Sequence, residues 1–269
     1  MTPQDFDYLR ALLRERSGLV LSAEKQYLAE SRLLPVARRH GMTTLGELVG
    51  KLKSASTAPM AAEVIEAMTT NETFFFRDKV PFGHFRDTIL PALIVARARE
   101  KRIRIWCSAS STGQEPYSLA MTLKGMGARL AGFRTEIVAT DISGEVLERA
   151  KAGIYSQFEV QRGLPIQQLV KFFSQVGETW QIAAEIRAMV QFRPLNLLKD
   201  FSALGTFDVV FCRNVLIYFD VDVKERVLGA IAARLRPGGW LFVGGAETTM
   251  GLNASFTPVA GTTGVYRKS

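Results

Sequence analysis

RIWCSASSTGQEPYSLAM, residues 104–121, is the stretch that decides how the rest of the chain folds. It opens with the apolar run at residues 104–107, which predicts a buried strand. Small residues follow as far as Gly113, and Pro116 then stands near the start of a periodic apolar run, which predicts a helix with proline in its first turn. A strand, a loop of small residues and a helix N-terminus together form the first unit of a nucleotide-binding α/β domain.

The loop in this stretch departs from the dinucleotide-binding pattern. It has one glycine, Gly113, in place of G-x-G-x-x-G, and Glu115 stands where a pyrophosphate would need donors. A carboxylate there repels phosphate but suits a ligand with cationic and hydroxyl groups. S-adenosylmethionine has both kinds of group, since it carries an amino group, a sulfonium and ribose hydroxyls. The alternative is a structural turn in an ordinary α/β fold.

Polar residues at the ends of later strands support a nucleoside site. Residues 135–141, TEIVATD, predict a strand that ends in Asp141, and an acid at the end of the second strand usually accepts ribose hydroxyls. Asn196 follows another predicted strand and is either an adenine ligand or a turn residue. Arg213 and Asn214 interrupt the apolar run FDVVFCRNVLIYFD, residues 207–220, at a strand's carboxyl end. Because polar residues are costly inside an apolar run, this pair favours a functional role.

Composition excludes several classes of protein. Hydrophobic residues at 47% and charged residues at 22% are typical of a globular protein, and no apolar run reaches the roughly 18 residues that span a bilayer. The N-terminal segment lacks an apolar signal core, so we expect a cytoplasmic protein without membrane insertion. Cys107 and Cys212 lie in predicted buried strands, and His40 and His84 are too few for a zinc cluster, so no metal site is expected.

The net charge of +8 is concentrated in one segment. Residues 74–105 contain eight Lys or Arg against three Asp or Glu, whereas residues 1–73 contain nine of each. A basic segment of this kind either guides an acidic partner or forms a solvated helix face.

We expect three parts along the chain. Residues 1–73 predict a helical domain, and its second helix has a basic side with Arg32, Arg38 and Arg39 that is either a docking surface or simply solvated. Pro35 should kink or interrupt that helix. Residues 74–102 form a linker or lid and a helix. Residues 103–269 form a Rossmann-like domain, with a small antiparallel β-subdomain inserted at about residues 154–189.

The segment TNETFFFR, residues 70–77, joins the first two parts. Its three phenylalanines, residues 74–76, must be buried, since otherwise they would form an exposed apolar patch. Polar residues surround them. The segment is either a domain junction packed by aromatic rings or a lid over a ligand pocket, with Asn71, Thr73 and Arg77 pointing inward.

Five ordered motifs give the chain a family resemblance: TNETFFFR, STGQEPYSLAM, ATDIS, PLNLL and FCRNVLIYF. Together they resemble the chemotaxis receptor methyltransferases, the CheR family, over nearly the whole chain. The resemblance implies transfer of the S-adenosylmethionine methyl group to glutamate side chains on the cytoplasmic helices of chemoreceptors. It also implies a helical N-terminal domain, a linker and a class I Rossmann-like methyltransferase domain with an inserted β-subdomain.

The resemblance also assigns roles to residues. Arg77 and Tyr218 are expected beside the transferring methyl, and Arg32, Arg38 and Arg39 match the part that meets the receptor. Some family members dock a pentapeptide at the receptor C-terminus through a glycine-rich loop. Here the matching loop, residues 174–179, has one glycine, so no pentapeptide docking is expected. The expected cofactor contacts are Asn71, Thr73, Arg77, Glu115, Asp141, Asn196, Leu197, Arg213 and Asn214.

Two other functions compete with this interpretation. A nucleic-acid methyltransferase would fit the pI of 9.7. Enzymes that methylate exocyclic amines carry a D/N-P-P-Y/F loop where this chain has RNVL, residues 213–216, and neither cysteine follows a proline as in cytosine-C5 enzymes. We therefore expect no nucleic-acid partner. A non-enzymatic module that binds the cofactor as a signal is the second alternative, and intact candidate residues at every site argue against it.

Overall fold

The computed structural model describes residues 1–54 and 58–269, which divide into two compact units. The helical unit comprises Met1–Thr70 with Tyr218–Lys224. The α/β unit comprises Asn71–Ile217 with Glu225–Ser269. Each unit is described by itself.

The helical unit is a small helix bundle around an apolar core. Its elements are α1 (Pro3–Ser17), the 3-10 turn η1 (Ala23–Lys25), α2 (Gln26–Arg39), α3 (Leu45–Lys53) and α4 (Ala58–Met68). Thr2 and Asp5 form a capping box that starts α1, and Gly18 ends the helix in the left-handed conformation. Leu13, Leu48 and Val64 are fully buried in the core. Pro35 lies inside α2, which continues to Arg39, so the expected interruption is wrong.

A late segment of the chain also belongs to the helical unit. The backbone N–H of Val20 donates to the carbonyl oxygen of Tyr218 over 2.9 Å. Arg14 Nε donates to Asp220 Oδ2 over 2.7 Å. These contacts anchor residues 218–224 against the region around the end of α1.

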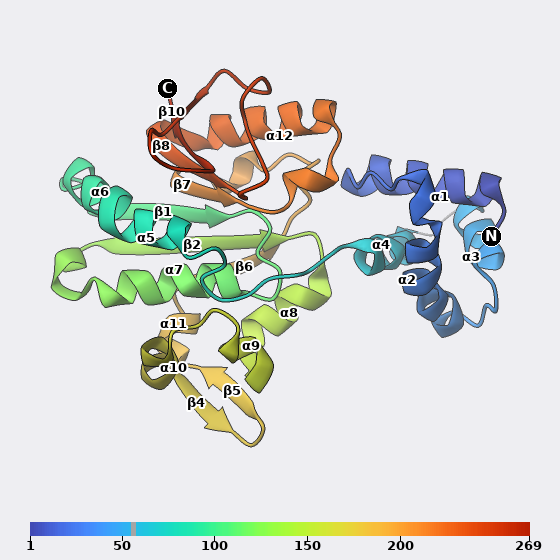
Figure 1. Ribbon diagram of the computed structural model, residues 1–269, viewed down its shortest axis with the longest axis horizontal. Helices are drawn as coiled ribbons and strands as arrows, with labels where there is room; N and C mark the ends of the chain where they lie inside the picture. Colours follow the sequence, from blue (N-terminus) through green and yellow to red (C-terminus); the bar gives the residue numbers. More distant parts are fainter. Residues whose placement is uncertain (55–57) are drawn as a thin grey trace. The chain divides into compact units, whose positions relative to one another are not determined.

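The α/β unit is built on one twisted sheet (Figure 1). In the described residues seven strands form it, in the order β6-β2-β1-β7-β8-β10-β9. The first five in that order are parallel, and β10 and β9 add an antiparallel edge. The strands are β1 (Arg102–Cys107), β2 (Arg134–Asp141), β6 (Val190–Pro194), β7 (Phe207–Cys212), β8 (Leu235–Val243), β9 (Phe256–Pro258) and β10 (Val265–Lys268). The crossover from β1 to β2 runs through α7 (Gln114–Gly125), as the sequence predicted.

Further helices connect these strands. The segment before β1 contains α5 (Val80–His84), the π-helical turn η2 (Phe85–Ile89) and α6 (Leu90–Ala96). Later elements are η3 (Gly127–Leu130), α8 (Gly144–Ala152), η4 (Ser202–Leu204), η5 (Leu216–Tyr218) and α12 (Val221–Arg234). Phe75, Phe85 and Tyr117 lie in the same apolar core as strands β1 and β7. Of the three consecutive phenylalanines, Phe75 is fully buried, whereas Phe74 and Phe76 are half-buried.

A second, smaller sheet interrupts the main one in sequence. Its described strands are β3 (Ile154–Ser156), β4 (Phe173–Val176) and β5 (Thr179–Ile182), antiparallel in the order β3-β5-β4. The short helices α9 (Gln157–Gln161), α10 (Ile166–Phe172) and α11 (Ala184–Arg187) accompany it. Figure 1 shows this β-subdomain below α7 and α8. Only Gly177 and Glu178 separate β4 from β5.

Three arginines of the basic segment at residues 74–105 pair with acidic side chains of the α/β unit. Arg97 Nε donates to Asp208 Oδ1 over 2.7 Å, and Asp208 is fully buried. Arg102 and Arg104 both bond the Glu136 carboxylate, at 2.8 Å and 3.1 Å. Because these three arginines have acidic partners near the amino ends of the strands, their charge is partly neutralised within the unit and contributes to the fold.

Candidate functional site

The parallel strands bring the polar residues of the prediction to one edge of the sheet. Strands β6, β2, β1, β7 and β8 run in the same direction, so their carboxyl ends lie together. Open α/β sheets bind ligands at that edge. Most charged and hydroxyl side chains that are buried in this unit lie at or just after the strand ends there: Ser108, Ser110, Ser111, Thr112, Glu115, Asp141, Ser143, Arg213 and Glu247.

The loop between β1 and α7 is closely packed at Gly113. Gly113 has a φ of 95°, and an added Cβ would come within 3.0 Å of Ala150 Cβ and 3.1 Å of the Tyr155 hydroxyl. Both the left-handed backbone and the close neighbours require glycine. The Tyr155 hydroxyl donates to the Thr112 carbonyl oxygen over 2.8 Å, so β3 of the β-subdomain helps to hold this loop.

Asp141 ties two loops together at the end of β2. Its Oδ2 accepts the Ser111 N–H over 2.8 Å, and its Oδ1 accepts the Ser143 N–H over 3.0 Å. The Ser111 hydroxyl in turn donates to the Asn71 carbonyl oxygen over 2.8 Å. The buried carboxylate therefore organises the loop after β1.

Arg213 connects the segment before α5 to the start of α7. Its Nη1 lies 3.0 Å from Glu115 Oε2, and its Nη2 donates to Asp78 Oδ2 (2.5 Å) and to the Arg77 carbonyl oxygen (3.1 Å). The Arg213 side chain is only 2% exposed. Burial raises the pKa of Glu115, and the neighbouring Arg213 opposes that effect.

Glu247 holds the loop that contains Asn214. Its carboxylate accepts the N–H groups of Asn214 (2.7 Å), Gly244 (2.6 Å) and Ile217 (3.1 Å). Asn214 has a φ of 57°, a conformation that asparagine tolerates better than most residues. Glu247 is not among the residues predicted from the sequence, although its place shortly after the apolar run WLFV, residues 240–243, is a usable signal of a strand end.

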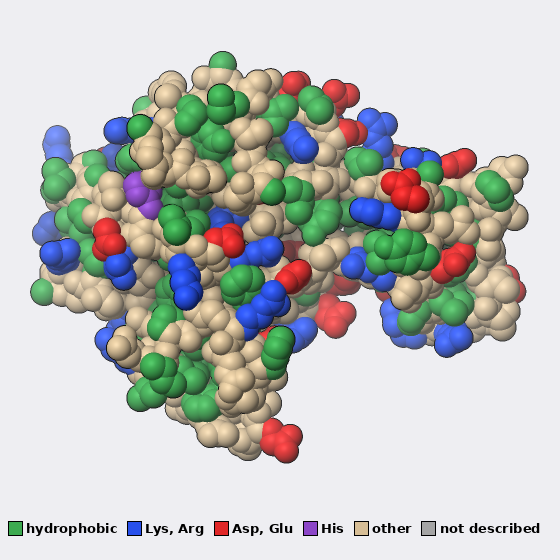
Figure 2. All heavy atoms as spheres, in the orientation of Figure 1, with side chains coloured by type: hydrophobic (Ala, Val, Ile, Leu, Met, Phe, Trp, Pro, Cys, Tyr) green, Lys and Arg blue, Asp and Glu red, His purple; other side chains and the backbone are tan. Residues whose placement is uncertain are grey.

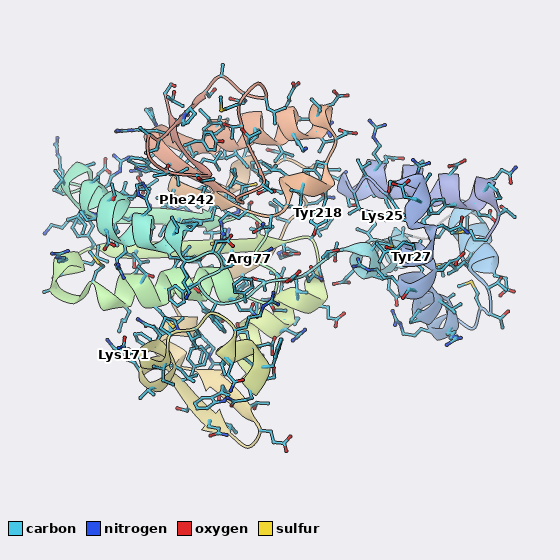
Figure 3. All side chains as sticks on the ribbon, viewed as in Figure 1. Lys25, Tyr27, Arg77, Lys171, Tyr218 and Phe242 are labelled. Atoms are coloured by element: carbon cyan, nitrogen blue, oxygen red, sulfur yellow. The ribbon has the colours of Figure 1, made fainter. Side chains whose placement is uncertain are left out.

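The remaining predicted cofactor residues occupy the same unit. Asn196 follows β6, where its Oδ1 accepts the Leu198 N–H over 2.9 Å, and Leu197 is buried. Thr73 is half-buried in the linker. The Arg77 Nη1 donates to the Glu72 carbonyl oxygen over 2.8 Å, in the position labelled in Figure 3.

Tyr218 and the three predicted receptor-contacting arginines lie in the helical unit. Arg32 Nη1 donates to the carbonyl oxygens of Met68 (2.8 Å) and Thr69 (2.9 Å), at the end of α4. Arg39 pairs with Glu63 at 2.5 Å. Arg38 is exposed, and no ion pair involves its side chain within residues 1–54 and 58–269. Arg38 is therefore the arginine of the three that is best placed to meet a partner.

The cysteines of the α/β unit are core residues. Cys107 and Cys212 are free thiols, fully buried at the ends of β1 and β7. Burial raises the pKa of both thiols well above its ordinary value, so both stay protonated and neither is a nucleophile. Among the described residues, no group of three or more His, Cys, Asp or Glu side chains is arranged to hold a metal.

The residues at the carboxyl edge fit S-adenosylmethionine. Two carboxylates, Glu115 and Asp141, are buried there, which suits amino and ribose hydroxyl donors. Within the described part of the chain, the buried Ser110 Oγ and Arg213 Nε lack a hydrogen-bond partner. Buried polar atoms of this kind need a partner, and a polar ligand provides one.

The sheet order and this site define a Rossmann-like, S-adenosylmethionine-dependent methyltransferase with a helical domain before it. The family model "CheR methyltransferase, SAM binding domain" matches residues 71–265, and "CheR methyltransferase, all-alpha domain" matches residues 4–69. The chain belongs to the CheR methyltransferase family. The resemblance drawn from the five motifs is thereby confirmed.

Similar proteins extend over nearly the whole chain. Chemotaxis protein methyltransferase 1 of Pseudomonas aeruginosa is 43% identical over 98% of this chain and 97% of the relative. Chemotaxis protein methyltransferase 1 of Vibrio cholerae is 38% identical over 100% of this chain and 98% of the relative. The chemotaxis protein methyltransferase of Escherichia coli is 36% identical over 94% of this chain and 87% of the relative. No helix in residues 1–54 and 58–269 is long and apolar enough to cross a bilayer.

Proposed function

We propose that this protein is a protein-glutamate O-methyltransferase that esterifies glutamate side chains on the cytoplasmic helices of chemoreceptors. The observation that carries the proposal is family membership over both units, together with relatives that are named chemotaxis protein methyltransferases. The protein acts in the cytoplasm, where its receptor substrates present those helices.

The cofactor site of the proposal lies at the carboxyl edge of the main sheet. S-adenosylmethionine supplies, when bound, a methyl group on a sulfonium. Glu115 and Asp141 offer carboxylates to its amino and hydroxyl groups. The other proposed cofactor contacts are Asn71, Thr73, Arg77, Asn196, Leu197, Arg213 and Asn214. Arg213 holds Glu115 in place, as their 3.0 Å ion pair indicates.

The chemistry requires little acid–base help from the protein. A glutamate carboxylate has an ordinary pKa of about 4.3, so it arrives as an anion near neutral pH and needs no general base. What it needs is alignment with the methyl group and exclusion of water. Arg77 orients the incoming carboxylate, and Tyr218 maintains the geometry beside the methyl.

The receptor contact of the proposal lies on α2. Exposed Arg38 meets the acidic methylation region by charge complementarity, whereas Arg32 and Arg39 act mainly through contacts within the helical unit. We also propose that the protein binds neither nucleic acid nor the receptor C-terminal pentapeptide. The two-residue turn between β4 and β5 supports the latter, because it leaves no glycine-rich loop.

Transfer of a radiolabelled methyl group from S-adenosylmethionine to receptor cytoplasmic fragments tests the proposal. Label that alkali releases as methanol identifies a carboxyl methyl ester, as expected. Alkali-stable label would mean N- or C-methylation and would favour a nucleic-acid-type methyltransferase. Tight cofactor binding with no transfer to any receptor fragment would favour a sensor module. Binding of the receptor C-terminal pentapeptide, measured by calorimetry, would contradict the absence of a tether site.

A further inference from the structure

The linker motif that contains Arg77 adopts an unusual backbone conformation. Phe76, Asp78 and Lys79 have φ values of 50°, 68° and 49°, a region of backbone conformation that residues other than glycine rarely adopt. Such a backbone persists only where surrounding contacts hold it. Those contacts therefore matter for the position of the Arg77 side chain.

Two residues of the motif hold the Arg77 guanidinium. Its Nη1 donates to the carbonyl oxygen of Glu72 over 2.8 Å. Its Cζ lies 5.6 Å from the centroid of the Phe74 ring, within the range of a cation–π contact. Both contacts come from the same short segment, so they fix Arg77 only if Glu72 and Phe74 are themselves fixed.

A second arginine, from the β-subdomain, engages both of those residues. Arg162 follows α9, and its Nη2 lies 2.5 Å from Glu72 Oε1. Its Cζ lies 4.5 Å from the same Phe74 ring that Arg77 approaches. The two guanidinium groups thus share one aromatic ring, and the Glu72 carboxylate compensates their charge. The hydrogen bond from Arg162 lowers the pKa of Glu72, so the pair stays ionised at neutral pH.

The backbone beside Arg162 packs directly against the linker. Gly163 has a φ of 85°, and an added Cβ would lie 2.1 Å from the Phe75 carbonyl oxygen and 3.0 Å from Phe74 Cδ2. The fully buried Phe75 ring packs edge-on against Tyr155 of the same subdomain, at 5.0 Å between centroids. Around the point where Figure 3 labels Arg77, Figure 2 shows basic, apolar and acidic side chains side by side on the surface.

We propose that Arg162 is a positioning residue for Arg77: it holds Glu72 and Phe74 from the β-subdomain, and these two residues hold the Arg77 guanidinium. The inserted subdomain is thus part of the methyl-transfer site and not only an appendage of the sheet. This inference rests on the proposed function for the role of Arg77. Its structural part, the attachment of the linker by Arg162, stands independently of the substrate.

The pair Lys124–Glu185 provides a matched control. Lys124 Nζ lies 2.7 Å from Glu185 Oε2, and the two side chains are 44% and 55% exposed. The Arg162 and Glu72 side chains are exposed to nearly the same extent, 41% and 55%. Exposed ion pairs of this kind contribute little to folding stability, so Arg162→Ala and Lys124→Ala should both fold. A difference between these two variants therefore reports on position and not on general stability.

Steady-state methylation of receptor fragments by the full chain is the first measurement. We expect Arg162→Ala to lower kcat on the order of ten-fold, with a much smaller change in KM for S-adenosylmethionine, because a misplaced orienting group affects the transition state most. Arg162→Lys should recover part of the loss, since it retains the charge next to Glu72. In a protein that already carries Arg77→Lys, adding Arg162→Ala should lower kcat only slightly further, because the two residues act as one unit. If the kcat of Arg162→Ala equals the kcat of wild type and of Lys124→Ala, the proposal is overturned.

Hydrogen exchange of the cofactor-free protein is the second measurement and does not depend on activity. The Phe76 N–H donates to Ser118 Oγ over 2.9 Å, so its exchange reports whether the linker stays in place. We expect faster exchange across residues 71–77 in Arg162→Ala and unchanged exchange in Lys124→Ala. Unchanged exchange in both variants would contradict the attachment. If wild type methylates no receptor fragment, the proposed function fails, while the exchange result still decides whether Arg162 attaches the linker.

Discussion

Arg213 and Glu115 are paired in the interior, with 3.0 Å between Nη1 and Oε2, although 98 positions separate them in the sequence. The Arg213 side chain is 2% exposed and that of Glu115 is 10% exposed. A buried ion pair is strongly coupled: removing Arg213 would leave the Glu115 charge uncompensated, and removing Glu115 would leave Arg213 with Asp78 as its remaining acidic partner. The same pair also lies at the carboxyl edge of the sheet, where we propose that the cofactor binds, so we expect stability and binding to be linked there.

Glu115→Gln should lower both the stability and the cofactor affinity of the protein. Loss of the Glu115 charge should reduce the free energy of unfolding by roughly 1.5–3 kcal/mol, because Asp78 still pairs with Arg213. In the double variant Glu115→Gln with Arg213→Met, the loss should be smaller than the sum of the two single losses. Urea unfolding and calorimetric titration with S-adenosylhomocysteine measure the two effects. Additive losses would show that the two residues are not coupled.

Glu247 should be as important for the loop of Asn214 as any predicted site residue. Glu247→Ala leaves the N–H groups of Asn214, Gly244 and Ile217 without their acceptor, which should cost about 2–4 kcal/mol of folding free energy. Gly244→Ala should act similarly, because its Cβ would lie 2.7 Å from both Glu247 Oε2 and Asn214 Nδ2. Urea unfolding measures both losses.

The neighbouring glycine provides the control for that experiment. An added Cβ at Gly245 meets no atom within 4 Å, so Gly245→Ala should leave stability and cofactor affinity near their wild-type values. If Gly244→Ala and Gly245→Ala reduce the free energy of unfolding equally, the loss comes from replacing a loop glycine and not from the contact with Glu247.

Arg77→Ala should fold normally and lose most of its activity. The Arg77 side chain bonds one backbone carbonyl and lies over one half-buried ring, so its removal changes the core little. Loss of the group that orients the carboxylate should lower kcat on the order of a hundred-fold. Circular dichroism and methyl-transfer kinetics separate the two properties. Arg86→Ala, at an exposed pair with Asp87, is the control, and near-normal turnover of Arg77→Ala would refute its catalytic role.

Local patterns were enough to predict the strands, the loop after β1 and the acids at strand ends. Those signals depend on neighbours in sequence: apolar period, small residues before Pro116, and a carboxylate directly after an apolar run. The assignment of Glu115 and Asp141 to one edge followed because parallel strands end together. Whether these residues touch the cofactor stays a prediction.

Long-range partners were not predictable in the same way. Arg32 looks like a surface cation on a basic helix, yet it bonds the last carbonyls of α4, 36 positions later. Arg97, Arg102 and Arg104 looked like a basic patch, yet Asp208 and Glu136 neutralise them. Arg162 lies 90 positions from Glu72 and belongs to the β-subdomain. Partners such as these are determined by tertiary packing, which a single sequence does not encode in its local pattern.

Arg38 and Arg32, both in α2, should therefore respond differently to substitution. Arg38→Ala should raise KM for receptor fragments several-fold, more at low salt than at high salt, and leave the melting temperature unchanged. Arg32→Ala should instead lower the stability by about 1–3 kcal/mol, because the last carbonyls of α4 lose a charged donor. Thermal unfolding and receptor titrations distinguish the two. A stability loss in Arg38→Ala would contradict its assignment as a free surface cation.

The Glu136 ion pairs should make stability depend on pH in the acid range. Burial alone would raise the pKa of Glu136, but hydrogen bonds from Arg104 and Arg102 outweigh it and lower the pKa to about 2. Because the folded-state pKa lies below the unfolded value of about 4.5, the pairs stabilise the protein above pH 4.5, and this contribution is lost as the pH falls towards 2.

Comparison with Glu136→Gln isolates this contribution. A lowering of this size corresponds to about 3 kcal/mol, so the wild type should be more stable than the variant by roughly that amount at pH 7. The difference should shrink from pH 4.5 downwards and be small near pH 2.5. Urea midpoints at several pH values measure it. A difference that stays constant between pH 7 and pH 3 would show that titration of Glu136 does not control stability in this range, because an amide has nearly the same shape as a carboxylate but does not titrate.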